Sequence, residues 1–176
     1  MARDRMQKQR FELKYLISEE TALRVRDFVQ TYLDFDEYSV GRHNFSYPVH
    51  SVYLDSDDLK TYWDTINGIK NRFKLRMRFY STNPDSPVFF EIKRRMNSII
   101  MKQRGGVRRA AVDWILNGSF PELEHLVAKK NPSQLMALQH FSELTAKLQA
   151  KPKVHIAYLR EAYVSEDDNY RLTMDR

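Results

Sequence analysis

The sequence predicts an α+β protein whose strands form an antiparallel β-sheet. Short segments in which apolar and charged residues alternate recur along the chain, and this alternation is typical of strands with one buried face. The predicted order of elements is β-α-β-α-β-β-β-ααα-β-β, which lacks the regular βαβ alternation of a parallel sheet. With 176 residues, 42% of them hydrophobic, the chain is expected to form one domain over residues 1–176, with a helical insertion at about 108–148.

The first predicted strand and helix lie at the start of the chain. Residues 9–17 alternate between apolar and charged side chains and predict a strand. Ser18, followed by two glutamates, is a typical helix start, and the helix is expected to end at about Leu33. The predicted apolar stripe of this helix consists of Val25, Phe28 and Val29.

A second strand and helix follow. Residues 49–55 predict the strand, and Ser56 or Asp57 is expected to cap a short helix that ends at Gly68. The predicted buried face of this helix consists of Leu59, Tyr62, Trp63 and Ile66.

The second half of the chain contains more strands than helices. Three strands are expected at about 72–80, 88–95 and 98–104. Residues 108–148 are predicted to be helical, with Asn131-Pro132 opening the longest helix. Two last strands are expected at about 153–163 and 169–175.

The composition narrows the classes of partner and of site. A net charge of +6 and a pI near 9.5 indicate an anionic partner. The absence of cysteine excludes a disulfide framework, a thiolate zinc site and a cysteine nucleophile. Neither a signal-peptide h-region nor the roughly 20 apolar residues of a membrane-spanning helix is found. We therefore expect a cytoplasmic chain without a membrane span, and a membrane-bound partner is left open.

The strongest functional pattern is a cationic face on the strand at 72–80. Side chains alternate between the two faces of a strand. Four cations of this strand therefore share one face, namely Arg72, Lys74, Arg76 and Arg78. Successive cations start about 7 Å apart, within the Debye length of about 8 Å, so they repel one another. A face that is merely solvated usually mixes both signs of charge.

The same bias recurs in other predicted strands. The sets that share a face are Glu91, Lys93 and Arg95; Lys102 and Arg104; Arg10, Glu12 and Lys14; Tyr158 and Arg160; and Arg171, Thr173 and Asp175. If these faces converge inside a closed antiparallel sheet, its interior is a cationic channel with a few carboxylates. A linear phosphate polyanion would fill such a channel with charge-assisted hydrogen bonds, and the carboxylates would suit a divalent cation.

At these residues the sequence resembles the polyphosphate polymerase (VTC) domain of the triphosphate tunnel metalloenzyme (CYTH-like) superfamily. The matching blocks are RFELKY (10–15), SVYLDS (51–56), RFKLRMRFY (72–80), FFEIKRR (89–95), YLREAY (158–163) and YRLTMD (170–175). The resemblance implies an antiparallel β-barrel tunnel with peripheral helices, which binds ATP and polyphosphate together with Mn²⁺ or Mg²⁺. In the polymerase branch, the ATP γ-phosphoryl is transferred to a polyphosphate chain.

The resemblance also implies a role for each matching residue. The set expected to hold the reacting phosphates is Lys14, Arg76, Arg78, Lys93 and Lys102. Further phosphate ligands are expected at Arg72, Lys74, Arg104, Tyr158, Arg160 and Arg171. The implied metal ligands are Glu12 and Glu91.

Two departures from the family pattern affect these expectations. Arg10 takes the place of the first Glu of the ExExK motif of the triphosphatase and cyclase branch, which favours the polymerase-like branch. The sequence ends at Asp175-Arg176, whereas the family continues with strands that carry its main metal-binding Glu and another Lys. The alternatives are a barrel that is incomplete at the C-terminus, a barrel completed by another chain, or a domain that binds without catalysis.

Two other functions remain open at this point. One is a non-catalytic polyphosphate sensor of the same fold. The other is a module for single-stranded nucleic acid, which ranks lower because the aromatics that flank Arg72 to Arg78 alternate onto the face opposite to the cations.

Overall fold

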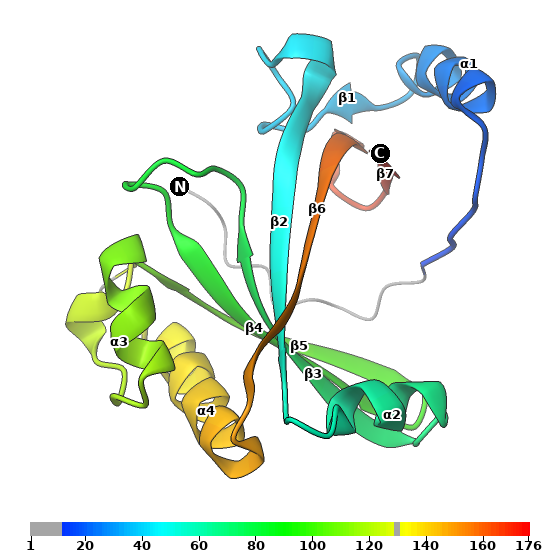
Figure 1. Cartoon of the computed structure of the whole chain (residues 1–176). Helices are drawn as coiled ribbons and strands as arrows, with labels where there is room; N and C mark the ends of the chain where they lie inside the picture. Colours follow the sequence, from blue (N-terminus) through cyan, green and yellow to red (C-terminus); the bar gives the residue numbers. More distant parts are fainter. Residues whose placement is uncertain (1–11, 129–130) are drawn as a thin grey trace. The chain divides into compact units, whose positions relative to one another are not determined.

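The computed structural model describes residues 12–128 and 131–176 (Figure 1). These residues form two compact units. The central unit comprises the described part of 50–156, and the terminal unit comprises 12–49 and 157–176.

The central unit is built on an antiparallel meander. Its strands are the second half of β2 (Ser46–Asp55), then β3 (Asn71–Phe79), β4 (Val88–Met96) and β5 (Ile99–Val107), and each pairs with the next. The first half of β6 (Lys151–Val164) belongs to the same unit, and β6 neighbours β2 in the strand order. The short loop at Asn97, whose φ is +53°, closes the β4–β5 hairpin.

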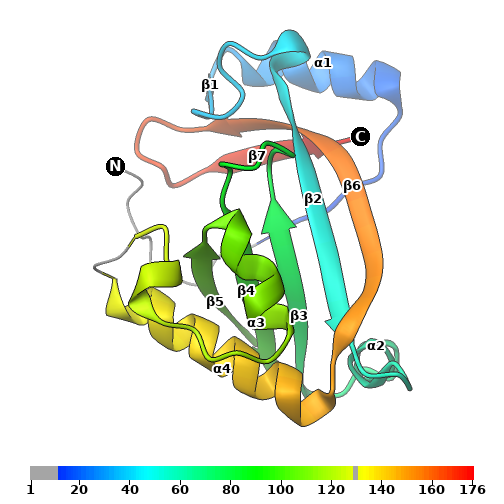
Figure 2. The ribbon, with the colours of Figure 1, turned by 60° about the vertical axis from the view of Figure 1, so that its left-hand side comes forward.

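Helix α4 (Pro132–Leu148) covers the apolar face of this sheet (Figure 2). Leu138 and Phe141 of α4 are buried in one core with Leu75 of β3 and Phe90 of β4. The Phe90 and Phe141 rings meet edge to face, with their centroids 5.0 Å apart. The sheet therefore has one face that is fixed by packing, and the alternate side chains of its strands point to the other face.

Gly105 allows α4 to lie close to β5. A Cβ at this position would be 2.4 Å from Leu138 Cγ and 2.7 Å from the carbonyl oxygen of Gln134. A larger residue would therefore force the helix away from the sheet.

Two shorter helices complete the central unit, α2 (Lys60–Ile66) and α3 (Val112–Leu116). Helix α2 begins where the buried Asp55 carboxylate accepts hydrogen bonds from the backbone N–H groups of Thr61 and Tyr62, each at 2.9 Å. Ser56 Oγ accepts a further bond from Lys60 N at 3.0 Å. These acceptors satisfy N–H groups that a helix start leaves without partners.

The terminal unit contains α1 (Glu19–Val29), β1 (Asp34–Phe35), the second half of β6 and β7 (Arg171–Asp175). Both β1 and β7 pair with β6 in antiparallel fashion. The core of this unit consists of Ala22, Val29, Tyr163 and Met174.

The predicted fold class and most predicted elements are confirmed. The protein is α+β with antiparallel strands, and the predicted strands from residue 49 onward lie within one to three residues of β2 to β7. Ser18 caps α1 by accepting a hydrogen bond from Thr21 N, and Asn131-Pro132 opens α4. Gly68 follows α2 with a φ of +66°, as its predicted role at the helix end requires.

Three predictions about local structure are wrong. Residues 12–17 contain no strand, and residues 9–11 of that predicted strand lie outside the described residues. Alternation favours a strand only where a neighbouring strand supplies hydrogen bonds, and Leu16 is fully exposed. Helix α1 ends at Val29 rather than at Leu33, and Phe28 of its predicted stripe is exposed.

The predicted buried face of α2 is also wrong. Leu59, Tyr62, Trp63 and Ile66 do share a face, but all four are exposed, with Trp63 at 51%. The spacing of apolar residues shows which side chains lie together on a helix, and it does not show that another element covers them.

Candidate anion-binding site

The strand registers place the predicted cations on one face of the central sheet. This cationic face is opposite to α4, because the residues that alternate with its members belong to the apolar core. Its Lys and Arg residues on β3, β4 and β5 are Arg72, Lys74, Arg76, Arg78, Lys93, Arg95, Lys102 and Arg104. Among the residues of these three strands on the same face, Glu91 is the single carboxylate.

Three lysines lie directly opposite one another across three strands. Lys74 of β3 is paired with Lys93 of β4, and Lys93 is paired in turn with Lys102 of β5. We call these three residues the lysine row. Like charges in directly opposed positions destabilise a sheet, and Glu91 Oε1, which lies 2.8 Å from Lys102 Nζ, offsets part of the repulsion in this row.

Glu91 lies at the centre of the cationic face and is fully buried. Arg76 Nε donates a hydrogen bond to Glu91 Oε2 at 2.6 Å. Glu91 Oε1 lies 2.8 Å from Lys102 Nζ and 3.6 Å from Arg104 Nε. Burial alone would raise the pKa of this carboxyl, but the charges of Lys102 and Arg76 outweigh burial and lower the pKa from 4.5 to about 2.

Burial favours the neutral form of Lys102 over the charged form. It lowers the pKa of the Lys102 ammonium, and the attraction of Glu91 only partly restores it, since Arg104 and Arg76 repel the same ammonium. A further anion beside Lys102 would raise its pKa again.

Two arginines of the face are fixed by polar neighbours on β2. Arg78 is buried, and its Nε donates a hydrogen bond to Ser51 Oγ at 3.1 Å. Arg76 Nη1 lies 3.5 Å from the Tyr53 hydroxyl. These two arginines are part of the sheet's own structure, whereas Lys93 is exposed.

The terminal unit carries its own arginine pairs. Arg160 of β6 binds Asp175 of β7 in a bidentate manner, with Nε and Nη2 each 2.7 Å from a carboxylate oxygen. Its Nη2 also lies 3.2 Å from the Tyr158 hydroxyl. Arg171 Nη2 is 2.5 Å from Oδ2 of the buried Asp36. Both arginines are therefore neutralised by acidic residues of the same unit.

The family assignment rests on a match over nearly the whole chain. The model of the VTC domain matches residues 9–176. The chain belongs to the VTC domain family. The VTC domain has the triphosphate tunnel (CYTH-like) fold and is linked to polyphosphate polymerase function. A search of curated proteins gave no match.

The predicted site residues of this VTC domain are divided between its two units. The central unit holds Arg72, Lys74, Arg76, Arg78, Glu91, Lys93, Lys102 and Arg104 on one face. The terminal unit holds Glu12, Lys14, Tyr158, Arg160 and Arg171. Within the terminal unit, Glu12 and Lys14 are exposed, and Lys14 Nζ lies 3.8 Å from Glu12 Oε1. The roles of these residues toward phosphate stay predictions, and Arg10 lies outside the described residues.

The role of Glu91 as a metal ligand stays a prediction for this VTC domain. Over 12–128 and 131–176, no group of three or more His, Asp or Glu side chains could hold a metal ion. Glu91 Oε2 accepts a hydrogen bond from Arg76, whereas the buried Oε1 has no hydrogen-bond partner among the described residues and lies 2.8 Å from Lys102 Nζ. The Mn²⁺ or Mg²⁺ that the resemblance implies remains a prediction. In the same described part of the chain, no helix is long and apolar enough to cross a membrane.

One feature of the cationic face was missed by the interpretation of the sequence. Phe89 lies on this face, directly opposite Gly106, and the Arg104 guanidinium lies 3.5 Å above its ring centroid. The sequence contained a signal for it, because Phe89 has the same strand parity as Glu91 and Lys93.

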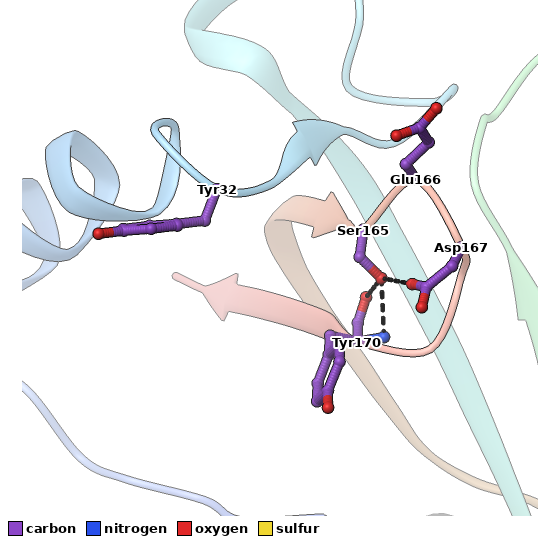
Figure 3. A pocket seen from close by; sticks show the side chains of 5 residues that line it. All are labelled: Tyr32, Ser165, Glu166, Asp167 and Tyr170. Carbon is purple, nitrogen blue, oxygen red and sulfur yellow. Dashed lines mark hydrogen bonds between the residues drawn. The ribbon is translucent and has the colours of Figure 1, made fainter.

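An open hollow of about 520 Å³ in the terminal unit does not suit a polyanion (Figure 3). It is lined by Tyr32, Ser165, Glu166, Asp167 and Tyr170. Ser165 Oγ donates to Asp167 at 2.6 Å and accepts from Tyr170 N at 3.0 Å, so these bonds hold the turn between β6 and β7. Glu166 and Asp167 would repel phosphate, so this hollow is not the candidate site for a polyanion.

Proposed function

We propose that this VTC domain binds ATP and polyphosphate on the cationic face and transfers the ATP γ-phosphoryl group to the polyphosphate chain. The observation that carries the proposal is the lysine row, in which Lys74, Lys93 and Lys102 oppose one another across three strands. The family supports it, since the VTC domain is linked to polyphosphate polymerase function.

The charge balance of the face favours a linear polyanion over a single anion. The opposed lysines repel one another across the strands. The cations continue along the strands from Arg72 to Arg78, at intervals of about 7 Å. A chain of phosphates that follows the strands can neutralise several of these cations at once, and each charge-assisted hydrogen bond contributes about 1.5–3 kcal/mol.

The chemistry of phosphoryl transfer suits such a face. A terminal oxygen of the polyphosphate chain attacks the γ-phosphorus of ATP, the bond from this phosphorus to the bridging oxygen breaks, and ADP leaves with the bonding electrons. The chain is one phosphate longer afterwards. Catalysis of this step depends on alignment and on the stabilisation of charge on the phosphoryl oxygens, and it needs no protein nucleophile. Lys74, Lys93 and Lys102 are cations that can supply both.

A binding experiment tests the phosphate-binding part of the proposal. The variant Lys74→Gln/Lys93→Gln removes two charges from the lysine row and leaves the Glu91 ion pairs in place. We expect affinity for tripolyphosphate, measured by calorimetry, to fall about 100-fold, as two charge-assisted hydrogen bonds of about 1.5 kcal/mol each imply. Arg76 and Arg78 are less suitable targets, because they bind Glu91 and Ser51 within the fold.

The matched control removes two strand lysines of the same unit. Lys151 and Lys153 lie on β6 and pair with Asp57, at 3.3 and 2.6 Å. Lys151→Gln/Lys153→Gln changes the net charge by the same amount, and we expect tripolyphosphate affinity to change less than threefold. Equal losses in both double variants would show that only net charge matters, which would contradict a site at the lysine row.

Turnover tests the catalytic part. The purified chain is incubated with ATP and short polyphosphate in Mn²⁺, in Mg²⁺ or in EDTA, and longer polyphosphate and ADP are measured. Longer chains, formed with metal and abolished by Lys74→Gln/Lys93→Gln, would support the transferase. Tight tripolyphosphate binding without turnover would instead support a polyphosphate sensor, and displacement of tripolyphosphate by single-stranded RNA would favour a nucleic-acid module.

A further inference from the structure

An aromatic ring lies at one end of the cationic face. Phe89 of β4 is directly opposite Gly106 of β5. A Cβ on Gly106 would be only 2.9 Å from Phe89 Cε1 and 3.1 Å from Cδ1. The missing side chain of Gly106 thus makes room for the edge of the Phe89 ring beside β5.

A guanidinium group lies over this ring. The Arg104 guanidinium carbon is 3.5 Å from the Phe89 ring centroid and 5.9 Å from that of Tyr80. The Tyr80 ring meets the Phe89 ring edge to face at 6.0 Å. Arg104 is held from a second side by Glu91, since its Nε lies 3.6 Å from the carboxylate. About a third of the Arg104 side chain (34%) is still exposed, so a flat ligand can reach its guanidinium plane.

The distance from the lysine row to this stack matches the length of a nucleotide rather than that of a short phosphate chain. Phe89 and Lys93 lie on the same face of β4, four residues apart, which is about 13 Å along the strand. Glu91 and its cations lie between them. If the phosphates of a nucleoside triphosphate lie on the lysine row and follow the strand, its ribose and base lie near Phe89 and Arg104. An inorganic phosphate chain carries no group that could stack there.

We propose that Phe89 and Arg104, with Tyr80 at the edge, form a stacking platform for the nucleobase of a nucleoside triphosphate. This inference rests on the proposed function and adds a specificity element to it. Stacking on an aromatic or guanidinium plane accepts every base, because each base has a π-face. The platform therefore favours purine over pyrimidine nucleotides through their larger stacking area, and it favours ATP over inorganic tripolyphosphate.

The test compares ATP with tripolyphosphate, because both carry three phosphates and only ATP carries a base. In Phe89→Leu, we expect affinity for ATP to fall about 10-fold to 100-fold and affinity for tripolyphosphate to change less than twofold. Arg104→Lys keeps the positive charge but removes the guanidinium plane, and ATP affinity is expected to fall by a larger factor than tripolyphosphate affinity. Phe89→Tyr keeps the ring and is expected to retain ATP affinity.

The control is a second phenylalanine of the same sheet with an arginine over its ring. Phe79 of β3 lies on the face that packs on the core, and the Arg109 guanidinium carbon is 4.9 Å from its centroid. Phe79→Leu is expected to leave the ratio of ATP to tripolyphosphate affinity unchanged. Unchanged tripolyphosphate binding in each phenylalanine variant also shows that the variant is folded.

The outcomes separate this inference from the proposed function. Equal weakening of ATP and tripolyphosphate in Phe89→Leu, or no weakening of ATP, would overturn the platform and leave the phosphate-binding proposal intact. Failure of the unaltered chain to bind either ligand would overturn the proposed function itself, and the platform with it. Selective loss of ATP affinity in Phe89→Leu and Arg104→Lys, but not in Phe79→Leu, would support the platform.

Discussion

Glutamine in place of Glu91 removes the negative charge at the centre of the cationic face. The substituted side chain has nearly the same size, so the change is one of charge and not of packing. Arg76 and Lys102 would then be left without their carboxylate, at positions where their side chains are only 16% and 25% exposed. We expect the Glu91→Gln variant to be less stable than the unaltered chain at pH 7.

The expected loss of unfolding free energy in Glu91→Gln follows from the buried ion pair and, independently, from the pKa of Glu91. Removal of one partner from a buried ion pair typically costs about 3–5 kcal/mol. The pKa of Glu91 is lowered from 4.5 to about 2, a shift that corresponds to about 3 kcal/mol of stabilisation by the ionised carboxylate. A loss of about 3 kcal/mol is large compared with the 5–15 kcal/mol total of a typical domain.

The measurement is urea unfolding at pH 7, with and without tripolyphosphate. A bound polyanion places negative charge beside the same cations, so tripolyphosphate should stabilise Glu91→Gln more than it stabilises the unaltered chain. Glu161→Gln is the matched control, because Glu161 of the terminal unit is equally buried and accepts two hydrogen bonds from Arg26, at 2.8 and 2.6 Å. This variant should lose stability without any additional gain from tripolyphosphate.

Two results would refute this reasoning. A free energy of unfolding within 1 kcal/mol of that of the unaltered chain would show that Glu91 does not hold the cations together. The same gain from tripolyphosphate in Glu91→Gln, Glu161→Gln and the unaltered chain would show that the anion binds away from Glu91.

Three further predictions concern the central unit. Because the pKa of Glu91 is lowered, its stabilising effect is fully present above pH 4.5 and is lost as the pH falls toward about 2. Urea unfolding at a series of pH values should therefore show that the free energy of unfolding falls less steeply with acid in Glu91→Gln than in the unaltered chain. Asp55→Ala should destabilise the protein by about 2 kcal/mol, since the backbone N–H of Thr61 loses its acceptor at the start of α2, and thermal unfolding monitored by circular dichroism checks this. Gly105→Ala should cost about 1–3 kcal/mol in urea unfolding because the added methyl group would overlap Leu138, and no loss would show that α4 can shift freely.

The cationic face could be predicted from the sequence, because the alternation of side chains along a strand depends only on neighbouring residues. Alternation over residues 72–80 and 88–95 predicts both the strands and the face on which each cation lies. The register between these strands depends on their turns. The opposition of Lys93 and Lys102 follows from the short loop at Asn97, a residue type that accepts the positive φ such a loop needs.

Other parts of the site depend on contacts that sequence patterns do not contain. Arg160 and Arg171 are typical phosphate ligands by residue type, but here they bind Asp175 and Asp36. Asp36 is 135 residues before Arg171 in the chain, and no periodicity links the two. The predicted strand at 9–17 fails over its described residues for a related reason, since a strand exists only where a partner strand is available.

The two faces of the central sheet together explain how a sheet can keep directly opposed lysines. The lysines in the two opposed pairs of the lysine row repel one another, and Glu91 offsets part of this repulsion at Lys102. Burial of one large apolar side chain contributes about 1.5–3 kcal/mol, and the α4 side of the sheet buries Leu75, Phe90 and Ile92. The core can therefore offset the repulsion while the face is empty. The opposed lysines are thus compatible with a stable sheet, and they are the positions whose charge the proposed polyanion would neutralise.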